Sequence, residues 1–597
     1  MSVHEEEILG KAYDAGLMRR LMGYLRPYWL QVLVALVAIV SASLLQLAQP
    51  YLMKVAIDEH IAQGSMEGLE RLALAFLAVL IGSFLLEFIQ TWVLQNTGQR
   101  IMFDMRMQIY RHLQRIDIQY YDRNPVGRLM TRVTTDVDVL NELFTAGVVS
   151  VFGDIFLLIG IMGALAWMDW RLAAIAFAVL PLIGMVTQWF RRNVRDSYRS
   201  VRTWIARINS FLQEHITGMS TVQLFRREQR SFEAFDAVNR GHRDANIDSI
   251  YYYAVFYPAI EVIGALSTAM IIWFGGNWVM EDTLSVGSFV AFVLYSQRFY
   301  RPISDLSEKF NILQAAMASS ERIFKLLDTP AKIVSRAGLG PPTTTAARGK
   351  HAGGTRGHIF FDDVSFAYGS DLVLQNVSFE VRPGERVGIV GATGAGKSTI
   401  INLLLRFYEV TTGRILVDGI DVREMDLQDL RRLFSLVLQD VHLFSGTIAS
   451  NIRLGQAAID DEALRLAATA VHADGFIQAL PAKYESPVAE RGATLSVGQK
   501  QLLSFARALA FDPRILVLDE ATSSVDTQTE LLIRDALHTL MAGRTTIAIA
   551  HRLSTIQDMD KILVLHRGQL RETGTHQELL AKRGIYYKLF QLQYREG

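Results

Sequence analysis

The stretch GATGAGKST at Gly391–Thr399 decides the fold of the C-terminal half of the chain. It follows the apolar run RVGIVG (386–391) and precedes STIINLLLRFY (398–408), whose apolar residues have helical spacing. A strand, a glycine-rich loop of this spacing and a helix form a phosphate-binding loop, in which backbone N–H groups and the helix dipole face phosphate oxygens. We therefore predict an α/β P-loop nucleotide-binding domain.

Two side chains of this loop have predicted roles of their own. Lys397 is expected to reach the β- and γ-phosphates of ATP, and the Ser398 hydroxyl to ligate Mg²⁺. The complete predicted ATP-binding loop consists of Gly391, Ala392, Thr393, Gly394, Ala395, Gly396, Lys397, Ser398 and Thr399.

Two further strand-like runs end in chemically useful side chains. ILVLDE (515–520) ends in Asp519 and Glu520, and TTIAIA (545–550) is followed by His551. Beside a phosphate loop, Asp519 is expected to hold Mg²⁺, Glu520 to polarise the attacking water, and His551 to contact the γ-phosphate. In isolation, such residues are more often exposed charges or a structural histidine. Their assignment therefore depends on the neighbouring motifs.

Composition excludes several classes of protein. The 597 residues contain 60 Lys plus Arg and 60 Asp plus Glu, so no basic excess supports a nucleic-acid partner. Half of the residues are apolar, and the mean hydropathy is +0.20, which argues against wholesale disorder. Without any cysteine, disulfides, thiolate catalysis and cysteine-ligated metal sites are excluded. That absence does not fix the compartment.

The N-terminal half contains long apolar runs that predict six membrane spans. A buried core helix is the alternative for any one of them, but six such runs make it a poor general explanation. The predicted spans are Pro27–Met53, Leu72–Gln99, Leu143–Met168, Leu172–Phe190, Ser249–Met280 and Thr283–Gln297.

The loops between these spans predict their orientation. Arg100–Glu142 contains seven arginines and Arg191–Ile247 contains eleven, whereas the other connections contain few basic residues. The positive-inside rule therefore places both long loops and both termini in the cytoplasm. Charges at Glu5–Glu7 occupy the place of a signal-peptide core, so the first span is expected to act as the insertion signal.

The composition changes again in the middle of the chain. AGLGPPTTTAARGKHAGGTRG (337–357) consists mainly of small and turn-forming residues, which predicts a flexible linker. We expect a membrane domain over residues 1–330, a linker over 331–357 and a nucleotide-binding domain over 358–597.

Taken together, these motifs make the chain resemble the ATP-binding cassette (ABC) superfamily over nearly its whole length. The resemblance rests on motifs that stand in family order: Tyr368, Gly391–Thr399, Gln439, Glu490–Gly492, Leu495–Gln499, Asp519–Glu520, Ser523–Asp526 and His551. It implies that Tyr368 stacks on adenine and that Gln439 contacts Mg²⁺ and water. It also implies that Ser523, Ser524 and Asp526 communicate across a dimer.

The membrane half resembles the six-span domain of exporter-type half-transporters. This resemblance rests on YYDRNPVGRLMTRVTTDVDVL (120–140), ITGMSTVQLF (216–225) and ERIFKLLD (321–328). It implies a domain-swapped dimer in which short helices in the long loops couple cassettes to spans. We expect one of these helices at Gly218–Gln223 and the other at or near Asp136–Glu142. It also implies that Leu495, Ser496, Val497, Gly498 and Gln499 clamp ATP bound to the opposite cassette.

This signature segment departs from the family pattern LSGGQ. Val497 replaces a glycine, and Leu502 replaces a basic residue; a β-branched side chain restricts the backbone and adds bulk where phosphate must approach. Glu520 and His551 are intact. The combination resembles the subunit of a heterodimeric exporter that carries the complete catalytic residues. A homodimer that tolerates Val497 is the alternative.

The cargo is less well indicated. Glu87, Asp154 and Glu261 interrupt apolar runs, and ionisable groups at membrane depth usually face protein or a water-filled cavity. Glu87 and Asp154 could lie on a cation-recognising pathway or in the inner interface. Glu261 favours the interface, being about one hydrocarbon thickness from Glu281. The aromatic residues Tyr251–Tyr253, Phe256 and Tyr257 could contact an amphiphile or pack between helices.

The resemblance favours an ATP-driven exporter of hydrophobic or amphipathic molecules in a bacterial inner membrane, with lipid as a neighbour. A lipid flippase and a siderophore importer use the same architecture, although no siderophore-handling domain precedes the first span. An ATP-gated channel or regulator is a further alternative, and the intact Glu520 argues against it.

Overall fold

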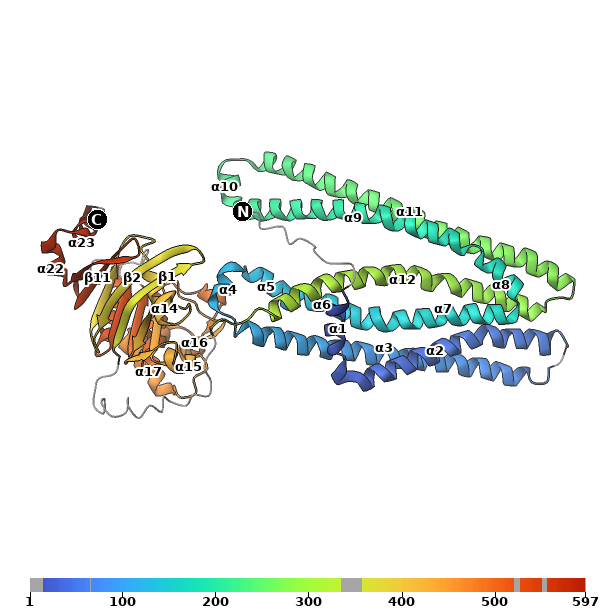
Figure 1. The fold of residues 1–597 in the computed structure, drawn as a ribbon, viewed down its shortest axis with the longest axis horizontal. Helices are drawn as coiled ribbons and strands as arrows, with labels where there is room; N and C mark the ends of the chain where they lie inside the picture. The colour runs from blue at the N-terminus through green and yellow to red at the C-terminus, as the bar shows by residue number, and fades with distance from the viewer. Residues whose placement is uncertain (1–13, 65, 334–356, 520–526, 550–555, 596–597) are drawn as a thin grey trace. The chain divides into compact units, whose positions relative to one another are not determined.

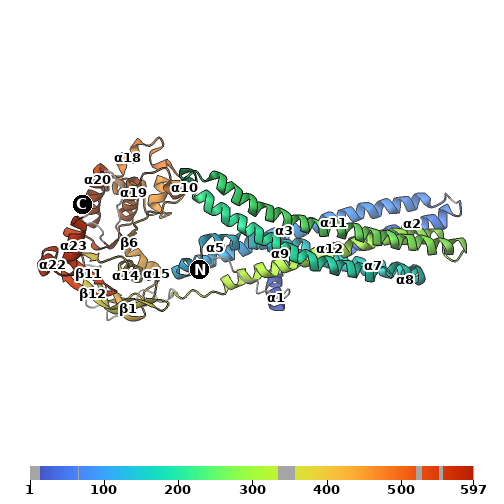
Figure 2. The same ribbon diagram turned by 90° about the horizontal axis from the view of Figure 1, so that it is seen from above.

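The computed structural model describes residues 14–64, 66–333, 357–519, 527–549 and 556–595. The chain divides into two compact units, which are shown in Figures 1 and 2. The first comprises residues up to Gln114 together with Val126–Thr329. The second comprises Arg115–Pro125 and the chain from Pro330 onward.

The regular secondary structure of the first unit is helical throughout the described residues. Its elements are α1 (Ala15–Gly23), η1 (Arg26–Tyr28), α2 (Trp29–Val55), η2 (Ala56–Ile61), α3 (Leu69–Leu113), α5 (Val126–Val133), α6 (Thr135–Glu142), η3 (Leu143–Gly147), α7 (Val148–Met168), α8 (Trp170–Phe177), α9 (Leu180–Thr217), α10 (Met219–Leu224), α11 (Glu228–Met280) and α12 (Val286–Leu327). The long helices α9 and α11 run side by side, and the short α10 joins their ends (Figures 1 and 2).

Five helical segments of the described residues are long and apolar enough to cross a bilayer. They are Arg26–Ile61, Leu69–Leu113, Val126–Met168, Trp170–Thr217 and Glu228–Met280. The sixth predicted span falls in α12, which is 42 residues long but is not among these five. Its apolar run is short, because Arg298 follows Val286 by only twelve positions. The sixth crossing therefore stays a prediction.

Helix α12 is tied to α2 at a proline. Pro50 lies inside α2 and has no N–H to donate to the carbonyl of Gln46. The guanidinium of Arg298 on α12 donates to that carbonyl at 2.8 Å and to Gln49 Oε1 at 2.6 Å. The Tyr295 hydroxyl donates to the neighbouring carbonyl of Leu47 at 2.5 Å. A polar side chain of α12 thus satisfies the acceptor that the proline leaves without its helical donor.

The second unit contains a parallel and an antiparallel sheet. The six-stranded sheet has the order β12-β11-β3-β10-β9-β6, with β12 alone antiparallel, and the antiparallel sheet has the order β2-β1-β4-β5. The strands are β1 (Ile359–Tyr368), β2 (Asp371–Val381), β3 (Arg386–Val390), β4 (Thr412–Val417), β5 (Ile420–Asp421), β6 (Phe434–Val437), β7 (Gly446–Thr447), β8 (Pro487–Val488), β9 (Ile515–Asp519), β10 (Thr545–Ile549), β11 (Lys561–His566) and β12 (Gln569–Gly574).

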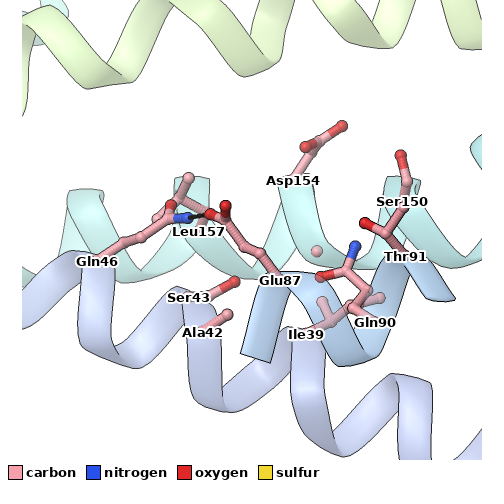
Figure 3. Close-up of a pocket in the computed structure, with 11 residues that line it drawn as sticks. Ile39, Ala42, Ser43, Gln46, Glu87, Gln90, Thr91, Ser150, Asp154 and Leu157 are labelled. Carbon is pink, nitrogen blue, oxygen red and sulfur yellow. Dashed lines mark hydrogen bonds between the residues drawn. The ribbon is translucent and has the colours of Figure 1, made fainter. Parts of the chain in front are cut away.

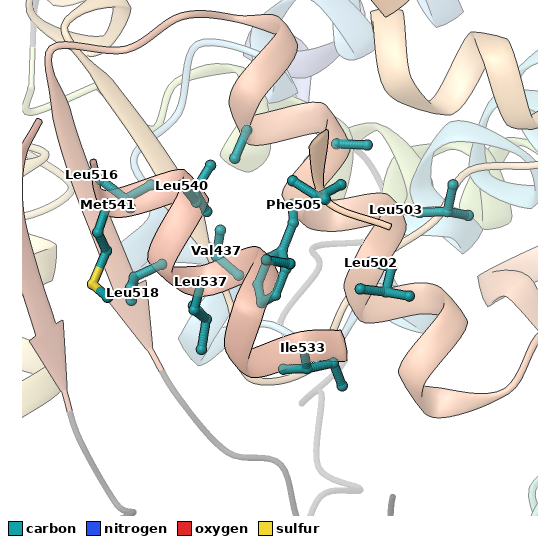
Figure 4. Close-up of a cluster of buried hydrophobic side chains, with 14 of the residues drawn as sticks. Val437, Leu502, Leu503, Phe505, Leu516, Leu518, Ile533, Leu537, Leu540 and Met541 are labelled. Atoms are coloured by element: carbon teal, nitrogen blue, oxygen red, sulfur yellow. The ribbon is translucent and has the colours of Figure 1, made fainter. Parts of the chain in front are cut away.

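Helices cover both faces of this sheet system. The helices of the unit are α4 (Ile118–Arg123), α14 (Lys397–Leu404), α15 (Leu427–Arg432), α16 (Ile448–Arg453), α17 (Asp461–Ala470), α18 (Asp474–Ala479), η4 (Lys483–Glu485), η5 (Glu490–Gly492), α19 (Val497–Ala510), α20 (Thr527–Met541), α22 (His576–Lys582) and α23 (Ile585–Arg595). One apolar cluster joins α14 to both sheets. A second joins α19 and α20 to β6 and β9 through side chains such as Phe505, Leu518 and Leu537 (Figure 4).

The parallel strands explain the apolar runs of the sequence. Every residue of β10 is buried, as are the first four residues of β9, because both faces of a covered parallel sheet are dry. In such a sheet, ligands bind at the carboxyl ends of the strands. A ligand-binding site is therefore expected among the residues at that edge of β3, β9 and β10.

Candidate functional site

The predicted phosphate loop leaves the carboxyl end of β3 and enters α14. A Cβ at Gly391 would lie 2.4 Å from the carbonyl oxygen of Leu565, so the close approach of β11 requires glycine there. Gly396 has φ of +100°, and a Cβ would lie 2.6 Å from Leu374 Cδ2. Gly396 has no side chain with which to cap α14. The backbone N–H groups at the start of α14 therefore donate no hydrogen bond to a capping side chain, as expected of a loop that binds phosphate.

Lys397 is placed for charge recognition at the start of α14. The side chain is 6% exposed, and its Nζ donates to the carbonyl oxygens of Gly391 at 2.8 Å and Ala392 at 3.1 Å. Burial lowers the pKa of Lys397, and the negative charge of Asp519 acts in the opposite direction. A buried amine that donates to two neutral carbonyls fits a site completed by anionic phosphate oxygens.

Strand register brings Asp519 to the same edge of the sheet. Ile549 of β10 pairs with Asp519 on one side and with Ile389 of β3 on the other. The side chain of Ser398 is exposed. A hydroxyl and a carboxylate at this edge form a donor set of the oxygen type that Mg²⁺ prefers. Gln439, the third predicted metal contact, is exposed in the connection that follows β6.

Several predicted site residues lie outside the described residues. They are Glu520, Ser523, Ser524, Asp526 and His551. Their predicted roles stay predictions from the sequence, as does the linker over 334–356.

The predicted adenine platform has an aromatic setting. Tyr368 is the last residue of β1, and its ring meets Phe366 and Tyr408 edge-on, with centroids 4.7 and 5.0 Å apart. Tyr408 was not among the predicted site residues. The run LLLRFY at the end of the predicted helix contained it, but periodicity alone reads that residue as core.

The altered signature begins helix α19. The Ser496 hydroxyl accepts from the N–H of Gln499 at 3.2 Å, and Gln499 Oε1 accepts from the N–H of Ser496 at 3.0 Å, which forms a capping box. Leu495 packs against the second apolar cluster, and Gly498 is buried. Val497, the first residue of the helix, is 55% exposed. The residue that departs from the family pattern therefore faces outward at a helix N-terminus.

The structure corrects the location of one predicted coupling helix. We expected it at or near Asp136–Glu142, which instead forms most of α6 and belongs to the first unit. The segment that clusters with the nucleotide-binding unit is Arg115–Pro125, which contains α4. The other expected location, Gly218–Gln223, coincides with the short helix α10.

A polar pocket of about 270 Å³ lies between α2, α3 and α7 in the first unit (Figure 3). It brings together Glu87 and Asp154, which are far apart in the sequence. Gln46 Nε2 donates to Glu87 Oε1 at 2.8 Å. Asp154 forms an ion pair with Lys309 of α12. The remaining polar lining residues are Ser43, Gln90, Thr91 and Ser150.

The aromatic residues of α11 are divided between packing and exposure. Phe256 stacks on Phe190 of α9 at 4.1 Å between ring centroids, and Tyr253 meets the same ring edge-on at 5.1 Å. Tyr251 and Tyr257 are exposed. Packing between α9 and α11 therefore accounts for Phe256 and Tyr253.

Comparison with known proteins gives the same division of the chain. The family described as "ABC transporter transmembrane region" matches residues 32–303, and the family described as "ABC transporter" matches residues 374–523. The ABC transporter ATP-binding protein YknV of Bacillus subtilis (strain 168) is 37% identical over 592 residues, which cover 99% of this chain and 96% of that protein.

Two other relatives carry functional names. The ATP-dependent lipid A-core flippase of Syntrophus aciditrophicus (strain SB) is 35% identical over 580 residues, covering 97% of this chain and 95% of the flippase. The "probable multidrug resistance ABC transporter ATP-binding/permease protein YheH" of Bacillus subtilis (strain 168) is 37% identical over 539 residues, covering 89% of this chain and 78% of that protein. The chain therefore belongs to the ABC transporter family, as an exporter-type fusion of one transmembrane region with one ATP-binding cassette.

Proposed function

We propose that this chain is one half of an ATP-driven exporter that moves hydrophobic or amphipathic small molecules across a bacterial inner membrane. The observation that carries the proposal is the buried Lys397 amine in a glycine cradle, beside Asp519 and on a chain with at least five membrane-type helices. A cassette that binds ATP on such a chain can couple ATP binding and hydrolysis to a reorientation of the membrane helices.

The proposed roles follow the geometry of the cradle. The N–H groups of the loop and Lys397 bind the triphosphate, and Tyr368 receives the adenine ring. Ser398, Gln439 and Asp519 hold Mg²⁺, which when bound neutralises charge on the phosphates. Glu520 orients and polarises the attacking water, and His551 contacts the γ-phosphate. Tight positioning supplies most of the rate in phosphoryl transfer, because little covalent chemistry falls to the protein.

The proposed partner is a second half-transporter, and a heterodimer is favoured. In this arrangement, Lys397, Asp519, Glu520 and His551 complete one hydrolytic site with the partner's signature. The signature of this chain, with Val497 exposed at the start of α19, closes a weaker site against the partner's phosphate loop. Added bulk where a phosphate must approach a helix N-terminus supports this asymmetry.

The short helices support a domain-swapped assembly. Helix α4 belongs to the nucleotide-binding unit of its own chain, whereas α10 belongs to the membrane unit. The apolar residues Leu224 and Phe225 at the tip formed by α9, α10 and α11 are 78% and 67% exposed. An exposed apolar tip on a protruding helix pair requires a cover. The partner's cassette is the proposed cover.

The isolated chain tests the heterodimer. Purified without any partner and reconstituted in lipid, it is expected to hydrolyse ATP slowly and without response to ethidium, a lipophilic cation, because its own signature closes the site poorly. Rates of phosphate release with and without ethidium check this. Full and ethidium-stimulated activity of the isolated chain would instead establish a homodimer.

The polar pocket is the proposed start of the substrate pathway. Asp154 is balanced by Lys309, whereas the acidic group of Glu87 meets an amide, so the lining has a net acidic character. Hydroxyl and amide groups supply the remaining contacts. Such a lining suits the ammonium or other cationic group of an amphiphile, because the hydrogen-bond acceptors of the pocket outnumber the positively charged groups beside it.

Replacing Glu87 by glutamine is therefore expected to weaken export of ethidium about tenfold, because the attraction for a cation at membrane depth is lost. Uptake of ethidium into inverted vesicles containing the whole transporter measures this. Glu70→Gln, in the first turn of the same helix, is the matched control and should transport as the unaltered transporter does. Equal effects of both variants would remove the pocket from the pathway. Movement of a fluorescent phospholipid in place of ethidium would favour a flippase.

A further inference from the structure

The short helix α4 is held at both ends by the nucleotide-binding unit. At its start, the Asp117 carboxylate accepts from the backbone N–H groups of Lys332 at 2.7 Å and Ile333 at 2.9 Å. At its end, the Asp122 carboxylate accepts a hydrogen bond from the Tyr408 hydroxyl. In the chain, α4 lies between α3 and α5, which both belong to the membrane unit. Helix α4 is therefore joined through the chain to two helices of the membrane unit.

Tyr408 connects this helix with two parts of the nucleotide site. Its ring is 8% exposed and meets Tyr368 edge-on, at 5.0 Å between centroids and with an interplanar angle of 88°. Tyr408 also follows α14 closely, and α14 begins at Lys397. A ligand that fixes Tyr368 and the start of α14 consequently limits the positions open to Tyr408.

The turn that holds Tyr408 is itself firmly packed. The guanidinium of Arg431 lies over the Phe407 ring at 5.0 Å from the centroid. Arg406, with φ of +52°, donates from Nε to Glu409 at 2.9 Å. Because the residues on both sides of Tyr408 are anchored and its own ring is buried, the position of its hydroxyl depends on the position of the turn.

The bond between Tyr408 and Asp122 is suited to reversible transmission. Burial, followed by the hydrogen bond to Asp122, raises the pKa of Tyr408, so the phenol remains a donor at neutral pH. A hydroxyl that donates to a carboxylate forms a stronger bond than one between two neutral groups. Asp122 is exposed, whereas the tyrosine ring is buried. When the two groups separate, water can hydrate the exposed carboxylate of Asp122. The free-energy penalty comes mainly from the buried phenol, which is left without an acceptor.

We propose that Tyr408 is a positioning residue that transmits nucleotide binding from Tyr368 to α4 through its hydrogen bond to Asp122. This inference rests on the proposed function, in which adenine stacks on Tyr368. Adenine binding orders the tyrosine pair, the phenol then holds Asp122 in one place, and α4 carries that constraint into α3 and α5.

The test measures transmission separately from binding. The chain has no cysteine, so cysteines that replace Glu67 and Asp282 can carry spin labels in the connection between η2 and α3 and in the connection that follows α11. The whole transporter in lipid is titrated with AMP-PNP, a non-hydrolysable ATP analogue. Electron-electron distance measurements between the labels give the ratio of the conformation adopted without nucleotide to the conformation adopted with it, and a fluorescent nucleotide gives the dissociation constant.

Tyr408→Phe is expected to reduce the AMP-PNP-induced change in that ratio about fivefold or more, the size typical of coupling between sites. Nucleotide affinity should change by less. Asp122→Ala should have the same effect, and the double variant should be no worse than either single variant, because all three lack the same bond. Asp122→Asn keeps an acceptor oxygen and should restore most of the response.

Tyr484→Phe is the matched control. It also removes a phenol that donates to a carboxylate, that of Asp474, at 2.6 Å in the same unit. A response of Tyr408→Phe equal to that of Tyr484→Phe would overturn the proposal, as would effects of Tyr408→Phe and Asp122→Ala that multiply in the double variant. Tyr368→Ala checks the underlying assignment: unchanged nucleotide affinity in that variant would contradict the adenine platform itself, whatever Tyr408 does.

Discussion

Replacing Glu520 by glutamine is expected to abolish most ATP turnover of the assembled transporter, by about 10²-fold or more, while ATP still binds. Glutamine has nearly the same size as glutamate but cannot take or hold a proton from the attacking water. The effect should be large for the whole complex, because the proposed second site is the weaker one. Phosphate release and binding of a fluorescent nucleotide, measured on the same preparation, check both parts.

Two outcomes would contradict this expectation in different ways. Retention of about half of the turnover would indicate that the partner chain supplies a second site of equal activity, which would contradict the proposed asymmetry. Loss of nucleotide binding together with turnover would indicate a disturbed fold rather than a missing base. Glu462→Gln, on the exposed first turn of α17, is the matched control and should hydrolyse ATP normally.

Replacing Lys397 by methionine is expected to remove both binding and hydrolysis. The amine is 6% exposed and is held by two carbonyl oxygens of the loop, so it is available to phosphate without a large rearrangement. Methionine keeps the apolar length of the side chain but supplies no charge. We expect nucleotide affinity to fall at least about tenfold and turnover about 10²-fold or more, as when one preorganised charge donor is lost.

Thermal unfolding of this variant separates chemistry from stability. Removal of a buried amine that burial already disfavours should leave the melting temperature without nucleotide close to that of the unaltered protein. The stabilisation that ATP gives the unaltered protein should be clearly reduced. Preserved nucleotide affinity in Lys397→Met would contradict the assignment of this amine to the phosphates.

The cassette was predictable because its chemistry stands at the ends of apolar strands. Val390, Asp519 and Ile549 end strands β3, β9 and β10, and the parallel register brings these three strand ends to one edge of the sheet. A sequence shows such a strand directly, since burial on both faces leaves an uninterrupted apolar run. The fold class and the family were confirmed on this basis.

The membrane pocket and α4 were harder to predict for a physical reason. Asp154 and Lys309 are 155 positions apart on different helices, and nothing local to either residue indicates its partner. Helix α4 is six residues long, too short to show a period, and its attachments use single carboxylates. Contacts of this kind depend on tertiary packing, which hydropathy and spacing do not record. The expected position at Asp136–Glu142 was wrong for this reason.

The hydrogen bonds between α12 and the carbonyl groups that precede Pro50 in α2 limit how these two helices can move. Arg298 and Tyr295 donate hydrogen bonds to the carbonyl groups of Gln46 and Leu47, respectively. These carbonyl groups lie one turn before Pro50, at the point where α2 would otherwise bend most easily. Sliding these two helices apart would separate a guanidinium and a phenol from the carbonyl oxygens that accept their hydrogen bonds. In the proposed transport cycle these two helices are therefore expected to move together as one rigid pair, and any change of angle between helices should occur elsewhere in the bundle.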